Sequence, residues 1–304
     1  MDIAITGSSG LVGTALKADL TAKGHRPIGV VRRQPKPGSD EIRWDPAAGT
    51  IDAESLDGIG AVVHLAGAGI ADKRWSDARK QLILDSRVDG TTLLATTLAG
   101  LANPPKAFVS GSAVGFYGSR GDEELTESST RGDGYLADVT VAWEEAAQPA
   151  IDAGIRTTLA RTGIVLSTSG GALAKQLPLF KFGLGGKLGN GRQWLPWISI
   201  DDEINALQFL IDNDVSGPVN LTAPAPCTNA EFTTALGKAL GRPTILPIPS
   251  FGPKLLLGAD LADALLFGSQ KILPNVLTDA GYDFVHPDIA TALNDICGRT
   301  RETA

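Results

Sequence analysis

The chain has 304 residues, of which 43% are hydrophobic and 20% are charged. This composition is typical of a soluble globular protein and excludes a disordered, a collagen-like or a coiled-coil chain. With 27 Lys and Arg against 34 Asp and Glu, the net charge is −7. That balance argues against nucleic acid or an anionic membrane surface as the main partner, because both require a basic face. A bound anion would have to be met by locally placed arginines.

Residue types that hold metals or form disulfides are scarce and scattered. The two cysteines and three histidines have no ligand spacing, so we expect neither a disulfide framework nor a metal site. The three acids at 201–203 are predicted to cap a helix. His64 lies inside an apolar run and is interpreted as a hydrogen-bonded core residue, whereas His25 and His286 are predicted to lie in turns. The N-terminus lacks the features of a secretory signal, which favours a cytoplasmic protein.

Short apolar runs alternate with longer helical patterns through the first half of the chain. Periodicity and length predict buried strands at 3–5, 28–31, 61–65, 107–109 and 157–161, and helices at 11–23, 77–99 and 136–153. This β-α-β rhythm predicts an α/β fold of the Rossmann type, in which helices cover both faces of a doubly wound parallel sheet.

The second half of the chain changes character. Residues 170–197 are rich in glycine and predict a long, partly helical insertion. Further on, the pattern predicts a helix at 229–240, a proline-spaced strand at 244–249 and two more helices ending near 296. We therefore divide the chain into a cofactor-binding domain (1–165), to whose sheet a strand near 217–222 returns, and a smaller mixed C-terminal lobe (166–304) that carries the substrate side and a helical module.

A glycine-rich loop follows the first predicted strand and opens the first predicted helix. Its glycines have the spacing GxxGxxG, which allows a tight turn, close approach of a pyrophosphate and close packing of helix on strand. We interpret it as a dinucleotide site, the alternative being a tight turn that binds nothing. The predicted cofactor-binding residues of this loop are Gly7, Ser8, Ser9, Gly10, Leu11, Val12 and Gly13.

Two arginines end the second predicted strand, where an acid would hold the ribose 2′-hydroxyl of NAD. The guanidinium groups of Arg32 and Arg33 suit the additional 2′-phosphate of NADP instead, since guanidinium binds phosphate in a bidentate manner. The alternative is a solvated basic turn. The sequence thus favours NADP(H) over NAD(H) as cofactor.

At this point three motifs resemble the extended, epimerase-like branch of the short-chain dehydrogenase/reductase superfamily. They are TGSSGLVG at 6–13, HLAG at 64–67 and SGSAVGFYG at 110–118. The resemblance implies that Leu65, Ala66 and Gly67 lie beside the adenine. Within this branch, the chain resembles in particular an atypical subfamily, commonly labelled as sugar-nucleotide epimerases, whose members end in a small helical module. The segments that carry this narrower likeness are 74–75, 85–88, 184–194, 220–224 and 273–296.

The resemblance also implies catalytic residues, with one departure. In the superfamily a tyrosine and a lysine four residues later share one helix face, so that the ammonium lowers the pKa of the phenol. Here Tyr135 is present but Val139 stands in the lysine position. As a proton donor, Tyr135 would need another cation or a water chain, and it could equally be a packing residue.

Ser112, at the end of the fifth strand, is the second catalytic candidate, because its hydroxyl could polarise a substrate carbonyl or alcohol. It could instead satisfy its own loop backbone. The subfamily likeness implies that Arg87 makes a charged contact to cofactor or substrate, and Arg161 carries a similar implication. Internal ion pairs are the alternative for such arginines.

The glycine-rich insertion combines cations, an aromatic residue and enough glycine to close over a ligand. The predicted substrate contacts are Trp75, Lys187, Arg192 and Trp194, which would suit a small, anionic substrate. A solvated surface loop and packing tryptophans are the alternative. We expect an NADP(H)-dependent oxidoreductase or epimerase-like enzyme for a small carbonyl, alcohol or nucleotide-linked substrate. The competing expectation is a non-catalytic NADP(H)-binding or redox-sensing protein. Because extended members of the superfamily often dimerise, a homodimer is also compatible with the resemblance.

Overall fold

The computed structural model describes the backbone of residues 1–302 and the side chains of residues 1–298. Its strands are β1 (Asp2–Thr6), β2 (Arg26–Val31), β3 (Glu41–Asp45), β4 (Thr50–Ile51), β5 (Ala61–His64), β6 (Ala107–Ala113), β7 (Glu124–Leu125), β8 (Arg156–Thr162), β9 (Ile164–Leu166), β10 (Trp194–Leu195), β11 (Trp197–Ser199), β12 (Gly217–Leu221), β13 (Cys227–Thr228) and β14 (Lys271–Ile272).

The α-helices are α1 (Leu11–Ala22), α2 (Asp77–Ala99), α3 (Tyr135–Glu145), α4 (Gln148–Asp152), α5 (Gly171–Lys181), α6 (Ile200–Asp212), α7 (Asn229–Leu240), α8 (Phe251–Leu257), α9 (Ala259–Ala262), α10 (Asn275–Asp279) and α11 (Ile289–Glu302). The shorter turns are η1 (Pro46–Ala48), η2 (Glu54–Leu56), η3 (Val114–Tyr117) and the π-helical η4 (Asp263–Phe267). Within residues 1–302, no helix is both long and apolar enough to cross a membrane.

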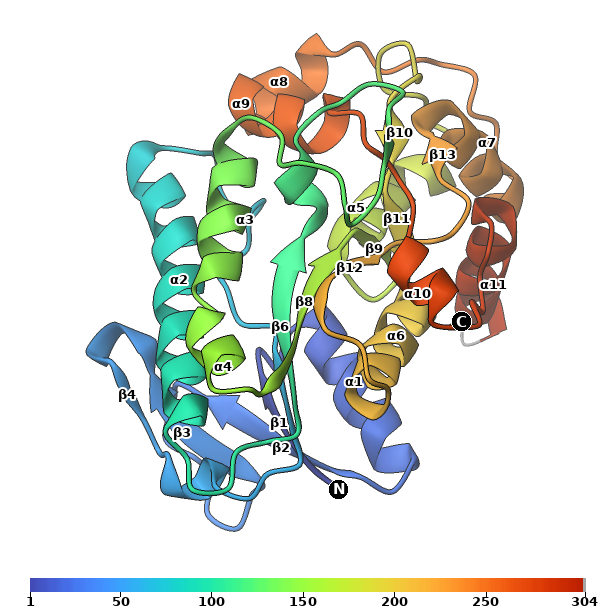
Figure 1. The fold of residues 1–304 in the computed structure, drawn as a ribbon. Helices are drawn as coiled ribbons and strands as arrows, with labels where there is room; N and C mark the ends of the chain where they lie inside the picture. The colour runs from blue at the N-terminus through green and yellow to red at the C-terminus, as the bar shows by residue number, and fades with distance from the viewer. Residues whose placement is uncertain (303–304) are drawn as a thin grey trace.

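One large sheet forms the centre of the molecule (Figure 1). Its strand order is β12-β8-β6-β5-β1-β2-β3-β4, and every neighbouring pair is parallel except β3 and β4. The order reverses between β1 and β5, which is where doubly wound sheets bind ligands at the carboxyl ends of their strands. The predicted Rossmann-type fold with a smaller C-terminal lobe is confirmed.

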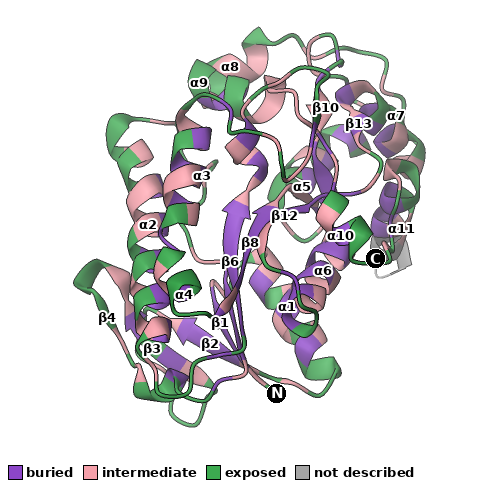
Figure 2. Cartoon of the chain, viewed as in Figure 1, coloured by how far each residue is buried: buried purple, intermediate pink, exposed green. Residues whose placement is uncertain are grey.

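Helices cover both faces of this sheet, so its central strands are buried (Figures 1 and 2). Leucines of α1 and α6 pack on one face against Ile3, Ile5 and Val63. The other face packs Val62 and Phe108 against α2 and α4. A separate core in the C-terminal lobe joins α5, α7 and α11 around the buried Trp197. Apolar burial on both faces explains why the strands read as continuous hydrophobic runs.

Several elements differ from the sequence-based expectation. Strand β3 was not predicted, and the region after residue 249, where two helices were expected, contains α8, α9, α10 and α11. The helix predicted at 136–153 is two helices, α3 and α4, because Pro149 opens a new first turn and has no amide to continue the α3 ladder. The strand predicted at 244–249 is wrong, since only one isolated bridge joins Ile248 to Leu188. The prolines of this segment remove the donors that a ladder would need.

The start of α6 fastens the C-terminal module to the sheet. Ser199 is the N-cap residue and accepts from the Asp202 amide, and three acids occupy the first turn, as the capping prediction requires. The Asp202 carboxylate also accepts from the backbone amides of Val285 and His286, at 2.8 and 2.9 Å. The first turn of α6 therefore holds the segment that leads into α11.

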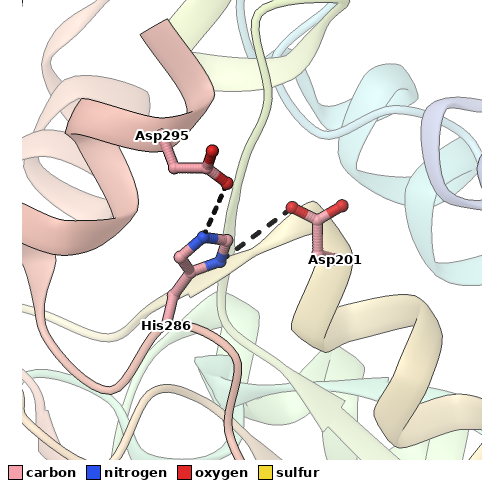
Figure 3. Close-up of side chains that lie close together, drawn as sticks. All are labelled: Asp201, His286 and Asp295. Atoms are coloured by element: carbon pink, nitrogen blue, oxygen red, sulfur yellow. Dashed lines mark hydrogen bonds and ion pairs between the residues drawn. The ribbon is translucent and has the colours of Figure 1, made fainter. Parts of the chain in front are cut away.

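His286 is a buried connector rather than a simple turn residue (Figure 3). Its Nδ1 lies 2.9 Å from the Ser199 hydroxyl, and its Nε2 lies 3.0 Å from Asp295 of α11. The Asp201 carboxylate lies 3.9 Å from Nδ1. The ring thus links the start of α6 to α11. Asp201, His286 and Asp295 are close enough together to hold a metal ion, so the expectation that the chain has no metal site stays a prediction.

Glu203 generates a prediction about pH and stability. It is buried in the first turn of α6, where Thr162 donates to Oε1 at 2.9 Å, and burial raises its pKa from 4.5 to about 8. Because the unfolded chain releases this proton near pH 4.5 and the folded chain only near pH 8, the wild type should lose stability as pH rises between these values. We expect Glu203→Gln to reduce this loss and to be more stable than wild type at pH 8.

Urea unfolding between pH 5 and pH 8 tests this expectation. Asp212→Asn, at an exposed carboxylate at the other end of α6, is the matched control and should keep the wild-type pH dependence. Identical pH profiles for Glu203→Gln and wild type would show that Glu203 does not carry the effect.

Candidate active site

The glycine loop between β1 and α1 has the close contacts that a dinucleotide loop requires. Gly7 has φ +65°, and a Cβ there would lie 2.8 Å from the carbonyl of Leu65. A Cβ at Gly13 would lie 2.3 Å from the Gly7 oxygen. Side chains at these two positions would therefore force β1, α1 and the end of β5 apart.

The first turn of α1 fits a pyrophosphate. Its N-cap is Gly10, and no side chain caps the helix, so amide donors of the first turn remain available to a ligand. A Cβ at Gly10 would meet only the Gly7 oxygen within 4 Å, at 3.3 Å, which leaves the approach to the backbone open. Ser8 and Ser9 complete the turn, and Leu11 and Val12 open the helix.

His64 organises the end of β5 and is a hydrogen-bonded core residue, as interpreted. Thr6 Oγ1 accepts from the amides of Leu65 and Ala66, so its hydrogen goes to His64 Nδ1 at 2.7 Å. Donor counting then places the imidazole proton on Nε2, which lies 2.9 Å from Thr91 Oγ1. Burial lowers the pKa of His64 to about 3, so the ring is neutral, and its bond to Thr6 helps to fix the backbone at Leu65 and Ala66.

Arg32 and Arg33 follow β2 and differ in their partners. Arg33 makes a two-pronged ion pair with Glu41, with Nη1 to Oε2 at 2.9 Å, and this contact lowers the pKa of Glu41 to about 2. Arg32 is exposed. Of the two, only Arg33 is held by a carboxylate in the described structure, so Arg32 is the better placed to meet an added phosphate.

A cavity of about 500 Å³ opens at the carboxyl edge of the sheet. The sheet side supplies the ends of β6 and β8, and α2 and α3 form one wall. The C-terminal lobe closes the opposite wall with the β10 strand and the segment around α9 and η4. Charged, aromatic and polar side chains of this lining include Trp75, Lys80, Arg87, Tyr135, Trp143, Trp194 and Gln270, and Val139 adds an apolar one.

Tyr135 opens α3 and faces this cavity. Its hydroxyl donates to the Lys80 carbonyl at 2.7 Å, and its ring meets Trp75 edge-on with centroids 5.0 Å apart. Burial raises the pKa of Tyr135, an effect that the charge of Arg87 opposes. The phenol is therefore neutral at pH 7 and suited to donating a hydrogen bond. Val139, one turn along α3, lines the same cavity with an apolar side chain.

Arg87 is a buried cation in the cavity wall. Its Nη1 donates to the carbonyls of Ala68 and Ile83 at 2.9 and 3.1 Å, and its guanidinium lies 4.9 Å from the centre of the Trp143 ring. Burial lowers its pKa to about 10, so it remains charged at pH 7. No carboxylate among the described side chains lies within 4.0 Å, so an internal ion pair does not explain it. Gly67 packs directly against it.

Ser112 and Arg161 share a buried partner, Glu144 of α3. The Ser112 hydroxyl donates to Glu144 Oε1 at 2.5 Å, and Arg161 Nε and Nη2 reach its two oxygens at 2.7 and 2.8 Å. Neither Ser112 nor Arg161 belongs to the cavity lining. Both side chains instead form hydrogen bonds to Glu144 within the protein. The catalytic role of Ser112 and the cofactor role of Arg161 stay predictions.

This network continues toward the C-terminal lobe through residues that the sequence did not predict as part of the site. Arg161 Nη1 donates to the Tyr117 hydroxyl at 2.9 Å, which donates to Asn220 Oδ1 at 2.7 Å. Asn220 in turn donates to the Leu273 carbonyl at 3.0 Å. Asn220 and Tyr117 lie within motifs of the family resemblance, but nothing in the sequence identifies Glu144 as the common partner of Ser112 and Arg161.

The four predicted substrate contacts divide into two groups. Trp75 and Trp194 line the cavity, and the Trp194 indole donates to Asp122 at 2.7 Å. Lys187 and Arg192 are exposed and lie outside the lining. Gln270, which was not predicted, lines the C-terminal wall of the cavity instead. Its side-chain amide donates to the carbonyls of Val114 and Gly118, both at 2.8 Å.

The buried ion pair predicts a large, one-sided loss of stability. Glu144→Ala would leave the Arg161 guanidinium, whose side chain is 4% exposed, without its carboxylate. Removing one partner of a buried pair costs about 3–5 kcal/mol. We expect this loss in the free energy of unfolding from urea titration, whereas Glu145→Ala, at the exposed next position, should change it by less than about 0.5 kcal/mol. Equal losses would show that the pair does not stabilise the fold.

Comparisons with known proteins agree with this architecture. Residues 3–222 match the model of the NAD dependent epimerase/dehydratase family, and residues 248–296 match a domain of unknown function, DUF1731. The chain is 47% identical over 294 residues to the epimerase family protein Mb2239 of Mycobacterium bovis, with 96% of each chain covered.

Two solved structures are also similar. The human epimerase family protein SDR39U1, determined with NADPH, is 35% identical with a TM-score of 0.90, and 98% of this chain and 99% of that chain are covered. The nucleoside-diphosphate sugar epimerase of Corynebacterium glutamicum is 40% identical with a TM-score of 0.79, covering 98% of this chain and 58% of that one. The chain therefore belongs to the NAD dependent epimerase/dehydratase family, in the extended short-chain dehydrogenase/reductase branch whose members carry a C-terminal DUF1731 domain.

Proposed function

We propose that this chain is an NADP(H)-dependent oxidoreductase or epimerase-like enzyme that acts on a small carbonyl, alcohol or nucleotide-linked substrate. The observation that carries the proposal is the cavity at the carboxyl edge of the sheet, which brings a neutral phenol, Tyr135, and a buried cation, Arg87, together. The glycine loop at the β1 and β5 switch point supplies the cofactor side.

The choice of NADP(H) rests on Arg32. It is exposed directly after β2, where the adenosine ribose lies in such folds, and Arg33 is held beside it by Glu41. The human relative SDR39U1 has been crystallised with NADPH, which supports the same cofactor here. The cofactor, when bound, would supply or accept a hydride at its nicotinamide.

Within the cavity each side chain has a definable task. Tyr135, protonated at pH 7, would donate its hydrogen bond to the substrate oxygen after exchanging it from the Lys80 carbonyl. Arg87 would stabilise negative charge that develops on this oxygen or is carried by an anionic substrate. The aromatic walls, Trp75 and Trp194, would exclude water from the reacting atoms.

A second candidate function is a non-catalytic NADP(H)-binding or redox-sensing protein. Two observations favour it: Val139 lines the cavity where the superfamily has lysine, and the Tyr135 hydroxyl is already bonded to a backbone carbonyl. Under this alternative the cofactor binds without turnover and changes the affinity for a partner.

Cofactor choice is tested by replacing both arginines. A hydrogen bond to a charged group contributes about 1.5–3 kcal/mol, so Arg32→Ala with Arg33→Ala should weaken NADPH binding by about 10- to 100-fold. NADH, which lacks the 2′-phosphate, should bind almost as before. Isothermal titration calorimetry measures both affinities, with Lys36→Ala as a control at a nearby exposed cation. Equal losses for NADPH and NADH would remove the argument for NADP(H).

Catalysis is tested by NADPH oxidation with a panel of carbonyl substrates. Loss of a general acid lowers kcat by about 10²- to 10⁴-fold, which we expect for Tyr135→Phe while the NADPH affinity stays unchanged. Arg87→Met should also lower kcat, and Arg87→Lys should restore part of it because it restores the charge. Tight NADPH binding with no turnover of any substrate would favour the non-catalytic function.

A further inference from the structure

Exposed large apolar side chains gather in two segments of the C-terminal lobe. Among the described residues, eight of the twelve exposed large hydrophobic side chains fall within residues 179–184 and 245–256. Their exposed fractions reach 81% at Phe182, 83% at Ile245 and 76% at Leu255. We call these two segments the apolar tip. The apolar tip includes Leu179, Phe182, Leu184, Ile245, Leu246, Phe251, Leu255 and Leu256.

The two segments lie side by side although they are distant in sequence. The Ile248 amide donates to the Lys187 carbonyl at 2.9 Å, and the Gly189 amide donates to the Ile248 carbonyl at 3.0 Å. Gly186 packs so closely on Leu246 that a Cβ would lie 1.7 Å from its oxygen. The chain after residue 184 therefore runs beside residues 246–248, and α8 follows these residues directly in the chain.

Helix α8 has no core of its own. It contains Phe251 and three leucines, yet none of its seven residues is buried (Figure 2). Short helices are marginal in water and normally owe their stability to an apolar face packed on a neighbour. Arg74 holds the end of the helix by donating to the carbonyls of Leu255 and Leu256. Phe251, Leu255 and Leu256 are therefore not covered by any described part of the chain.

Charge within the two segments of the apolar tip and their flanks is positive, although Lys254 of α8 is paired with Asp263, which follows α8 in the chain. Residues 171–200 and 240–259 together contain six Lys and Arg and no Asp or Glu, whereas the whole chain has a net charge of −7. Lys181, Lys187 and Arg242 are exposed, and no described carboxylate forms an ion pair with them. The net charge of −7 argued against a membrane partner, but this average over the whole chain does not reflect the local surface of the apolar tip, which is basic and apolar.

We propose that the apolar tip docks on an anionic lipid surface, with its leucines and phenylalanines in the interface and its lysines and arginines against the headgroups. Protruding apolar side chains flanked by cations suit a bilayer, which needs no complementary pocket. A symmetric dimer through the same surface would place like charges opposite each other, which disfavours it.

The position of the apolar tip connects it to the cavity. Figure 1 places α8 and α9 beyond the carboxyl ends of β6 and β8. Helix α9 and η4, which follow α8 directly in the chain, supply Asp260, Asp263 and Leu265 to the cavity lining. Docking would therefore hold the cavity close to the lipid surface. This inference does not depend on the proposed enzyme activity.

Vesicle co-sedimentation of the full chain tests the proposal. We expect binding to phosphatidylcholine vesicles that contain phosphatidylglycerol, little binding to phosphatidylcholine alone, and release by high salt. Burying one leucine contributes about 1.5–3 kcal/mol, so Leu255→Asp with Leu256→Asp should weaken binding by at least about tenfold. Lys181→Glu with Lys187→Glu should weaken binding to the anionic vesicles as well.

Ile151→Asp is the matched control, because Ile151 is an exposed apolar residue on α4, at the opposite end of the molecule in Figure 1. It should bind vesicles like the wild type, and circular dichroism should show that all variants are folded. No binding to anionic vesicles, or equal binding to both vesicle types, would overturn the proposal. It would also be overturned by a wild-type dimer in light scattering that Leu255→Asp with Leu256→Asp converts to a monomer without any change in vesicle binding.

Discussion

The buried ion pair between Arg161 and Glu144 is the interaction on which the site geometry depends. It joins the carboxyl end of β8 to α3 through two hydrogen bonds, and both side chains are almost completely enclosed. Such a pair is stable only when its remaining polar atoms are satisfied, and Ser112 and Tyr117 do this. The pair thereby fixes α3 against the sheet edge, and α3 carries Tyr135 and Val139 into the cavity.

The same network reaches the C-terminal lobe. From Tyr117 it passes to Asn220 on β12 and to the backbone at Leu273, just before α10. Within the C-terminal lobe, the Asp202 carboxylate accepts from the His286 amide and links the start of α6 to the segment before α11. Fully satisfied buried polar networks of this kind add rigidity and favour one arrangement of the residues that they join. This rigidity suits a site that must place a substrate against a cofactor.

The fold and the cofactor loop could be predicted because their signals are local. Strand periodicity and the glycine spacing of residues 7–13 depend on neighbours a few positions away, and the structure shows why glycine is needed at Gly7 and Gly13. Side-chain partners could not be predicted, since they come from distant segments. Glu144 binds the side chains of Ser112 and Arg161, which keeps both out of the cavity lining. The predicted substrate cations Lys187 and Arg192 lie outside the cavity because the glycine-rich insertion turns them to the surface.

The central claim is that one cofactor spans the glycine loop and the cavity. A crystal structure of the chain with NADPH tests it most directly. We expect the phosphates at the amides that begin α1, the 2′-phosphate at Arg32, and the nicotinamide next to Tyr135, with room for a substrate whose reacting atom lies about 3–3.5 Å from the nicotinamide. A nicotinamide turned away from Tyr135 and Arg87, or an adenosine bound elsewhere than at the end of β2, would contradict it.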